Sequence, residues 1–259
     1  MLEEPFSSGT SPMHRLDPRC KILAAVCSAI PTALMQHMES ALAALAISLL
    51  LMAMARPPAG PLMRRMALVN LFMALLWIFL PFSTPGTPLA NFGPLTATAE
   101  GIRLAALITL KSNAIILTFI ALIATSTVTA TGSALSSLHV PDKLALLFLF
   151  TWRYIHVIAQ EYERLCTAAK IRGFIPGTNM HTYRTYANLA AMVLVRSWDR
   201  AERVNSAMRL RGFSGTFRTL HEQRLHLQDI ATALMLTAPF LICFGYDLIL
   251  RFGPLTVTP

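Results

Sequence analysis

The sequence predicts an all-α protein: a polytopic membrane helical bundle of about five transmembrane helices with long amphipathic cytoplasmic helices. Three observations lead to this prediction. The chain of 259 residues is 54% hydrophobic and only 14% charged, whereas an ordinary soluble domain is about 25% charged. It contains five apolar runs. Its lysines and arginines are concentrated in a few segments, which is typical of the cytoplasmic loops of a membrane protein.

The apolar runs predict the transmembrane helices. They lie at residues 22–35, 41–55, 66–82, 102–125 and 230–250. The first two are shorter than the usual span of about 20 residues, so flanking residues must complete the crossing. The proline-rich stretch 56–61 ends the second helix, because proline cannot continue the hydrogen-bond ladder. Residues 83–101 are rich in proline, glycine and threonine and are expected to form a loop.

The positive charges predict the orientation. Segments 1–21, 56–65 and 126–229 hold 19 of the 22 lysines and arginines, whereas segments 36–40 and 83–101 hold none. Positive loops stay in the cytoplasm. The expected division is therefore a cytoplasmic N-terminus (1–21), transmembrane helices 1–4 (22–125), cytoplasmic coupling helices (126–229), and a last transmembrane helix with the C-terminus (230–259). The same asymmetry explains the net charge of +9 without a nucleic-acid partner.

Two long helices are expected in the cytoplasmic segment. The first begins at Pro141 and Asp142, and no proline or glycine interrupts it before Arg172. A break follows at 173–181. Thr182 is the expected N-cap of the second helix, which runs to Arg211. Each helix starts apolar and ends charged, so we expect the pair to pack beneath the membrane with its ends in water.

The two helices end in a repeated sequence. ERLCTAAKIRGF ends at Phe174 and ERVNSAMRLRGF ends at Phe213, with six of twelve positions identical at an offset of 39 residues. Gly173 and Gly212 stand where a helix C-terminus adopts the left-handed conformation. Ordinary capping, with a cation in the last turn, would explain one such ending. A matched pair favours two similar contacts with a partner, so the candidate site residues are Arg172, Gly173, Phe174, Arg211, Gly212 and Phe213.

Motifs for catalysis or metal binding are absent from the sequence. It contains no GxxxxGK[ST] and no GxSxG, and its four cysteines form no CxxC pair. We therefore expect no catalytic residue and no metal ligand in this chain. Lys111 lies within the fourth apolar run, where a lysine costs about 2.5–3.5 kcal/mol on insertion scales. Structural pairing and a role in subunit contact or transport both remain open for it.

The paired arginine-glycine ends also carry a resemblance. Together with RYIHVIAQEYER at 153–164, RSWDRAERV at 196–204, LDPRCK at 16–21 and VPDKLALLFLFTWRYI at 140–155, they resemble the transmembrane coupling subunit of energy-coupling factor (ECF) transporters, in the CbiQ/NikQ branch. The resemblance covers most of the chain and is strongest from about 140 to 215. The family usually has a small residue before Arg-Gly, whereas this chain has Ile171 and Leu210.

The resemblance implies a non-catalytic permease subunit of the bacterial inner membrane for cobalt or nickel uptake. Its implied partners are CbiO/NikO-like cytoplasmic ATPase subunits, a CbiM/NikM-like substrate-binding membrane subunit and a small CbiN/NikN-like accessory subunit. The ATPases would bind ATP and Mg²⁺, so this chain needs no cofactor, and Co²⁺ or Ni²⁺ would be the transported substrate. Arg172 and Arg211 would pair with acidic groups of the ATPases. The glycines would allow the turn, and Phe174 and Phe213 would fill apolar pockets.

Two other functions remain open from the sequence. An integral membrane enzyme could use a basic cytoplasmic face to bind an anionic lipid. Such an enzyme should cluster carboxylates or histidines near the membrane surface, and these are scattered here. A scaffold with no transport role is the third alternative, and substrate uptake assays would separate it from the first.

Overall fold

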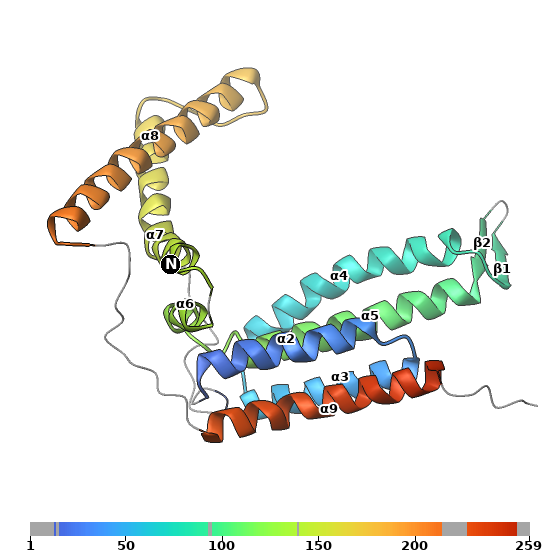
Figure 1. Cartoon of the computed structure of the whole chain (residues 1–259). Coiled ribbons are helices and arrows are strands. Elements are labelled where there is room, and N and C mark those ends of the chain that lie inside the picture. The colour runs from blue at the N-terminus through green and yellow to red at the C-terminus, as the bar shows by residue number, and fades with distance from the viewer. Residues whose placement is uncertain (1–12, 14–15, 93–94, 139, 214–226, 253–259) are drawn as a thin grey trace, which may run out of the picture. The chain divides into compact units, whose positions relative to one another are not determined.

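A computed structural model describes residues 13, 16–92, 95–138, 140–213 and 227–252 (Figure 1). Most of the expected N-terminal segment 1–21 and the end of segment 126–229 lie outside the described residues. The chain divides into two compact units. The membrane bundle comprises Glu4–Thr127 with Gln223–Pro259, and the coupling unit contains Val128–Glu222.

The membrane bundle is built of helices, with one short hairpin. The helices are α2 (Pro18–Leu34), α3 (Met38–Ala55), α4 (Ala59–Ser83), α5 (Ala99–Leu122) and α9 (Leu227–Phe252), and the hairpin strands are β1 (Pro88–Phe92) and β2 (Leu95–Thr98). Among the described residues, four helices are long and apolar enough to cross a membrane: Met38–Ala55, Ala59–Ser83, Ala99–Leu122 and Asp229–Arg251. Helix α2, from the first apolar run, has 17 residues, fewer than the roughly 20 of a full span. The predicted all-α membrane bundle is confirmed.

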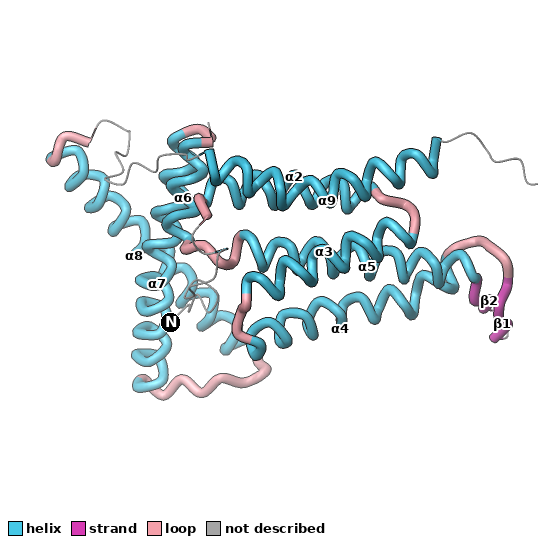
Figure 2. The backbone as a smooth tube through the Cα atoms, turned by 90° about the horizontal axis from the view of Figure 1, so that it is seen from below, coloured by secondary structure: helices cyan, strands magenta, loops and turns pink. Residues whose placement is uncertain are grey.

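Small side chains bring the helices of the bundle together. Helix α3 packs on α5, α2 on α9, and α4 on α5 (Figure 2). The core between them includes Ala25, Ala44, Ala114 and Ala121, all fully buried. Alanines let helix backbones approach closely, which suits a bundle whose outer surface faces lipid rather than water. Large apolar side chains point outwards instead, most of all along α4.

A buried carboxylate joins α9 to the turn between α2 and α3. Asp247 accepts hydrogen bonds from the backbone N–H groups of Gln36 (3.1 Å) and His37 (2.9 Å) and contacts His37 Nδ1 (3.0 Å). Its side chain is only 3% exposed. Close by, Lys111 Nζ donates to the carbonyl of Ala33 at the end of α2 (3.1 Å). Lys111 therefore has a structural partner. This agrees with structural pairing, one of the two roles that the sequence left open for it.

Three features of the membrane bundle differ from the sequence expectation. Residues 83–101 do not form a plain loop, because β1 and β2 pair antiparallel there. Helix α5 starts at Ala99 rather than near 102, since the Thr98 hydroxyl accepts the N–H of Gly101 and caps it. Helix α4 starts at Ala59 rather than near 66, because prolines that end one helix are tolerated in the first turn of the next.

The coupling unit contains α6 (Val128–Ser137), α7 (Asp142–Ile171) and α8 (Met180–Leu210). Helix α7 begins where Pro141 and Asp142 predicted. The prediction that Thr182 is the N-cap of α8 is wrong. The cap is Asn179, whose Oδ1 accepts both the N–H of Thr182 (2.9 Å) and the Thr182 hydroxyl (2.7 Å). An asparagine carbonyl is as good a capping acceptor as a threonine hydroxyl, and here it reaches the amide three residues on.

Asp247→Ala should destabilise the membrane bundle, because it leaves the amides of the α2–α3 turn without their acceptor. We expect a loss of about 1.5–3 kcal/mol in the free energy of unfolding, the range for hydrogen bonds to a charged group, and a lower melting temperature in detergent. Glu39→Ala is the control, since Glu39 is exposed and has only a 3.5 Å contact with Tyr246. Equal melting temperatures for the two variants would contradict this role of Asp247.

Candidate functional site

The two long helices of the coupling unit end in the same backbone structure. Gly173 has φ +84° and Gly212 has φ +78°. At the first end the N–H of Phe174 donates to the carbonyl of Ala169 (3.1 Å), and the N–H of Gly173 to that of Lys170 (3.0 Å). Phe213 and Gly212 make the corresponding bonds to Met208 and Arg209 with the same lengths. This pair of bonds defines the Schellman motif, so the left-handed glycine predicted at each end is confirmed.

The cap fixes the backbone of the arginines. Arg172 (φ −83°, ψ 15°) and Arg211 (φ −88°, ψ 10°) are the last residues before each glycine. Both side chains are exposed. The residues before them, Ile171 and Leu210, are 83% and 89% exposed. Sequence reasoning noted these two only as a departure from the family pattern, and the signal that distinguishes them is their matched place in the repeat.

Each phenylalanine packs back on its own unit. The centroid of the Phe174 ring lies 5.7 Å from that of Tyr186, edge to face, and 6.3 Å from that of His181, and both partners are on α8. Phe213 is partly buried and lines a groove with Phe150 and Tyr154 of α7 and Met208 of α8. Both rings therefore help to hold the turn after the glycine.

An ion pair joins α7, about two-thirds of the way along it, to the middle of α8. Glu161 on α7 forms an ion pair with Arg196 on α8, and Arg164 lies 3.8 Å from the same carboxylate. The hydrogen bond from Arg196 holds the pKa of Glu161 below its usual value. Neither member of this interhelical pair was singled out from the sequence, because residues 35 positions apart carry no local signal.

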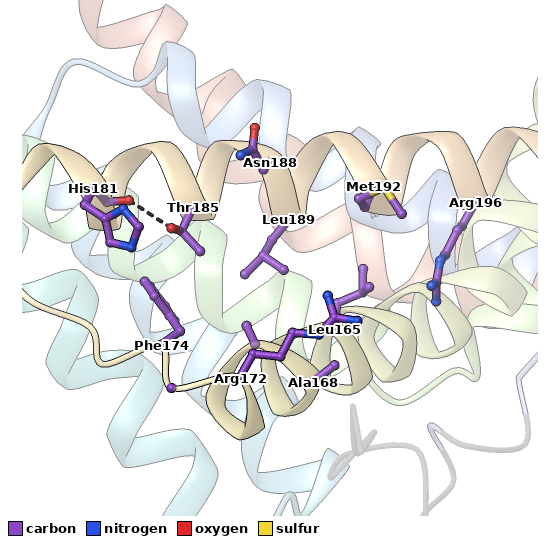
Figure 3. Close-up of a pocket in the computed structure, with 12 residues that line it drawn as sticks. Leu165, Ala168, Arg172, Phe174, His181, Thr185, Asn188, Leu189, Met192 and Arg196 are labelled. Atoms are coloured by element: carbon purple, nitrogen blue, oxygen red, sulfur yellow. Dashed lines mark hydrogen bonds between the residues drawn. The ribbon is translucent and has the colours of Figure 1, made fainter.

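Grooves lie on both sides of this contact. One, of about 570 Å³, is lined by the end of α7 and the first half of α8. In Figure 3, Arg172 and Phe174 lie along its α7 side, and His181, Thr185 and Leu189 along its α8 side. The other, of about 380 Å³, lies between the first half of α7 and the second half of α8 and includes Phe213. The Glu161–Arg196 contact therefore lies between two grooves, one towards the end of α7 and the other towards the end of α8.

The described residues offer no evident metal centre. Among them, no group of three or more histidine, cysteine, aspartate or glutamate side chains could hold a metal ion. The four cysteines are free. What the site provides is a pair of exposed, positively charged helix ends.

These features define a multi-pass helical membrane protein with two matching helix ends. The chain belongs to the CbiQ family, described as cobalt transport protein, whose family model matches residues 9–222.

Several similar proteins are named as transmembrane proteins of energy-coupling factor transporters. The chain is 27% identical to the energy-coupling factor transporter transmembrane protein EcfT of Acidaminococcus fermentans, over 92% of this chain and 93% of that protein. It is 27% identical to the EcfT of Heliobacterium modesticaldum, over 79% and 81% of the two chains. For the EcfT of Streptococcus equi the identity is 26%, over 81% and 82%.

Gly173→Ala and Gly212→Ala should each strain the backbone by about 1–2 kcal/mol, because a Cβ disfavours the left-handed conformation. Nothing lies within 4 Å of either added Cβ, so the effect is conformational and not steric. Amide hydrogen exchange of the last helical turn should accelerate in these variants. Gly177→Ala is the control, since Gly177 has no positive φ. Equal exchange rates in all three variants would show that the left-handed glycine does not stabilise the last helical turn.

The Glu161–Arg196 pair should hold the middle of the helix pair at neutral pH. Because the pKa of Glu161 is lowered in the folded protein, its stabilisation is present above the ordinary glutamate pKa and is lost as pH falls through the lowered value. Spin labels on α7 and α8 should show a broader distance distribution in that acidic range. Glu161→Gln should show it already at neutral pH, and Glu163→Gln, an exposed neighbour, should not. A narrow distribution in Glu161→Gln would refute the assignment.

Proposed function

We propose that this chain is the transmembrane coupling subunit of an ECF-type transporter that takes up a divalent transition metal. The observation that carries the proposal is the pair of identical capped ends on two helices of 30 and 31 residues. The family and the EcfT relatives support it, since their names describe cobalt transport and an energy-coupling factor transporter. The family description makes cobalt the first substrate to test, with nickel as the second.

The proposed partners are two cytoplasmic ATPase subunits and a substrate-binding membrane subunit, resembling CbiO/NikO and CbiM/NikM, with a small CbiN/NikN-like accessory subunit. ATP and Mg²⁺ would bind to the ATPases. The positive charges of segment 126–229 support a cytoplasmic position for the coupling unit, since positively charged segments stay inside. This orientation gives the ATPases access to both helix ends.

In this proposal Arg172 and Arg211 each bind acidic groups on one ATPase subunit. A guanidinium offers a directional fork of donors, and the cap holds both arginines at nearly the same backbone angles. Gly173 and Gly212 permit the sharp turn that exposes the arginines. Phe174 and Phe213 brace that turn against the coupling unit. Closure of the ATPase pair then moves both helix ends, and α7 and α8 transmit the motion.

The alternative of a membrane enzyme acting on an anionic lipid is less well supported. Its basic face is equally explained by orientation in the membrane. The family and the relatives, whose names are those of transport proteins, favour the coupling role.

The test is capture of the ATPases by the full chain, followed by metal uptake in proteoliposomes. Arg172→Ala and Arg211→Ala should each weaken ATPase capture by about tenfold or more, as expected for a desolvated charged contact. The double variant should fold normally and lose uptake. Arg203→Ala, an exposed arginine away from both ends, should behave as the unmodified chain. The coupling role fails if the double variant captures ATPase and drives uptake normally.

A further inference from the structure

One charged side chain lies in the middle of a membrane-spanning helix. Lys111 stands twelve residues after the first residue of α5 and eleven before the last. At 1.5 Å per residue it is therefore about 17 Å from either end of the helix. A lysine side chain is much shorter than this distance, so its ammonium group does not reach the headgroups at either interface. In the sequence, no other lysine, arginine, aspartate or glutamate occurs between positions 104 and 141.

The membrane bundle gives this ammonium group a single acceptor. Lys111 Nζ donates to the carbonyl of Ala33 (3.1 Å), and that hydrogen bond is exposed. An ammonium group has three N–H donors, and within the described part of the chain Lys111 makes no second hydrogen bond and no ion pair. Asp247 accepts the N–H groups of Gln36 and His37 instead. Two donors of Lys111 and its positive charge are therefore left without a match.

The neutral polar side chains nearby satisfy one another. Asn113 Nδ2 donates to Asn70 Oδ1 (3.1 Å) and Asn70 Nδ2 to Asn113 Oδ1 (3.3 Å), so a reciprocal amide pair joins α4 to α5. The indole N–H of Trp77 donates to the hydroxyl of Thr109 between the same two helices (3.0 Å). Lys111 takes part in neither contact and bonds to α2 instead. The bundle thus pairs these neutral groups internally and leaves the charged group short of partners.

An exposed apolar face of α2 accompanies the lysine. Leu23, Val26, Ile30 and Leu34 are all exposed and recur at helical spacing, and Ile30 and Leu34 are each 56% exposed. Ala33, whose carbonyl accepts from Lys111, is exposed on the same face. Lipid tails cover apolar side chains, but they offer no acceptor to an ammonium group. A spanning helix that carries a carboxylate at the matching depth covers the apolar face and satisfies the charge.

We infer that Lys111 is a docking residue for the substrate-binding membrane subunit and pairs with a carboxylate on a spanning helix of that subunit. This inference rests on the proposed function and specifies a contact of the membrane bundle. Charge complementarity selects a carboxylate, because Lys111 is a cation without an ion-pair partner among the described residues. The partner helix lies along the exposed face of α2, with its apolar side chains on Ile30 and Leu34 and its carboxylate opposite Lys111.

Neither a lipid nor a second copy of this chain supplies that carboxylate. The anionic groups of lipids lie at the interfaces, about 17 Å from the middle of α5. In this chain the five apolar runs contain a single carboxylate, Asp247. It is 3% exposed and already accepts the N–H groups of Gln36 and His37. The carboxylate must therefore come from a different membrane protein.

The experiment purifies the full chain in detergent together with its substrate-binding and ATPase subunits. Lys111→Met should reduce capture of the substrate-binding subunit about tenfold or more, because one member of a desolvated charge pair is lost, and should leave ATPase capture unchanged. Lys111→Arg should retain that capture. Arg103→Met is the matched control, since Arg103 is an exposed cation near the start of the same helix. The melting temperature of the Lys111→Met chain alone should not fall, whereas a purely structural role of Lys111 requires a fall.

Carbodiimide coupling identifies the partner carboxylate directly. Dicyclohexylcarbodiimide enters apolar surroundings and condenses Lys111 Nζ with an adjacent carboxyl group to an amide, and the reagent takes up the released water as its urea. Mass spectrometry of the complex should find Lys111 linked to an aspartate or glutamate of the substrate-binding subunit. Lys111→Arg should give no such link. A link to Asp247, or no link to Lys111, would overturn the inference.

The outcomes separate this inference from the proposed function. If Lys111→Met captures the substrate-binding subunit and the ATPases as the unmodified chain does, the charge pair is wrong and the coupling role stands. If the unmodified chain captures neither kind of subunit, the proposed function fails and this inference fails with it. Selective loss of the substrate-binding subunit from Lys111→Met, with ATPase retained, supports both.

Discussion

The left-handed glycine at the end of each long helix is the constraint on which the site depends. With φ near +80° at Gly173 and Gly212, the chain reverses sharply and the last carbonyls receive partners from the turn. The reversal leaves Arg172 and Arg211 as the final exposed residues of their helices. It also directs the following phenylalanines back onto the coupling unit. One backbone conformation thus both exposes the two arginines and places the two phenylalanines against the coupling unit.

In the coupling role proposed for this chain, the contact between α7 and α8 would be the point through which motion of the helix ends is transmitted. Glu161 and Arg196 join the two helices, and a groove lies on each side of this contact. Arg172 lies eleven residues beyond Glu161, and Arg211 fifteen beyond Arg196. At 1.5 Å per residue, these arms are about 16 and 22 Å long. A small rotation about the central contact therefore becomes a larger displacement at each arginine.

Local sequence signals predicted the local features of this protein. The apolar runs predicted the spanning helices, and the glycines predicted the caps, because each depends on composition or on a few adjacent residues. The N-cap of α8 was misplaced since Asn179 and Thr182 are both competent acceptors and only the backbone geometry chooses between them. The Glu161–Arg196 pair and the packing of Phe174 on Tyr186 join residues that the sequence separates. No pattern along the chain encodes them, so they required the structure.

The two units are stabilised by different interactions, and the difference bears on function. The membrane bundle depends on alanines at close helix contacts and on a buried carboxylate, Asp247, that satisfies the amides of a turn. These interactions favour a single packing arrangement. In the coupling unit, charged and apolar side chains remain exposed along α7 and α8, above all at their ends. A long helix with an unused apolar residue between two cations at its end is poorly explained by internal packing. Such an apolar surface leaves water only when another surface covers it, and the same surface occurs at both helix ends.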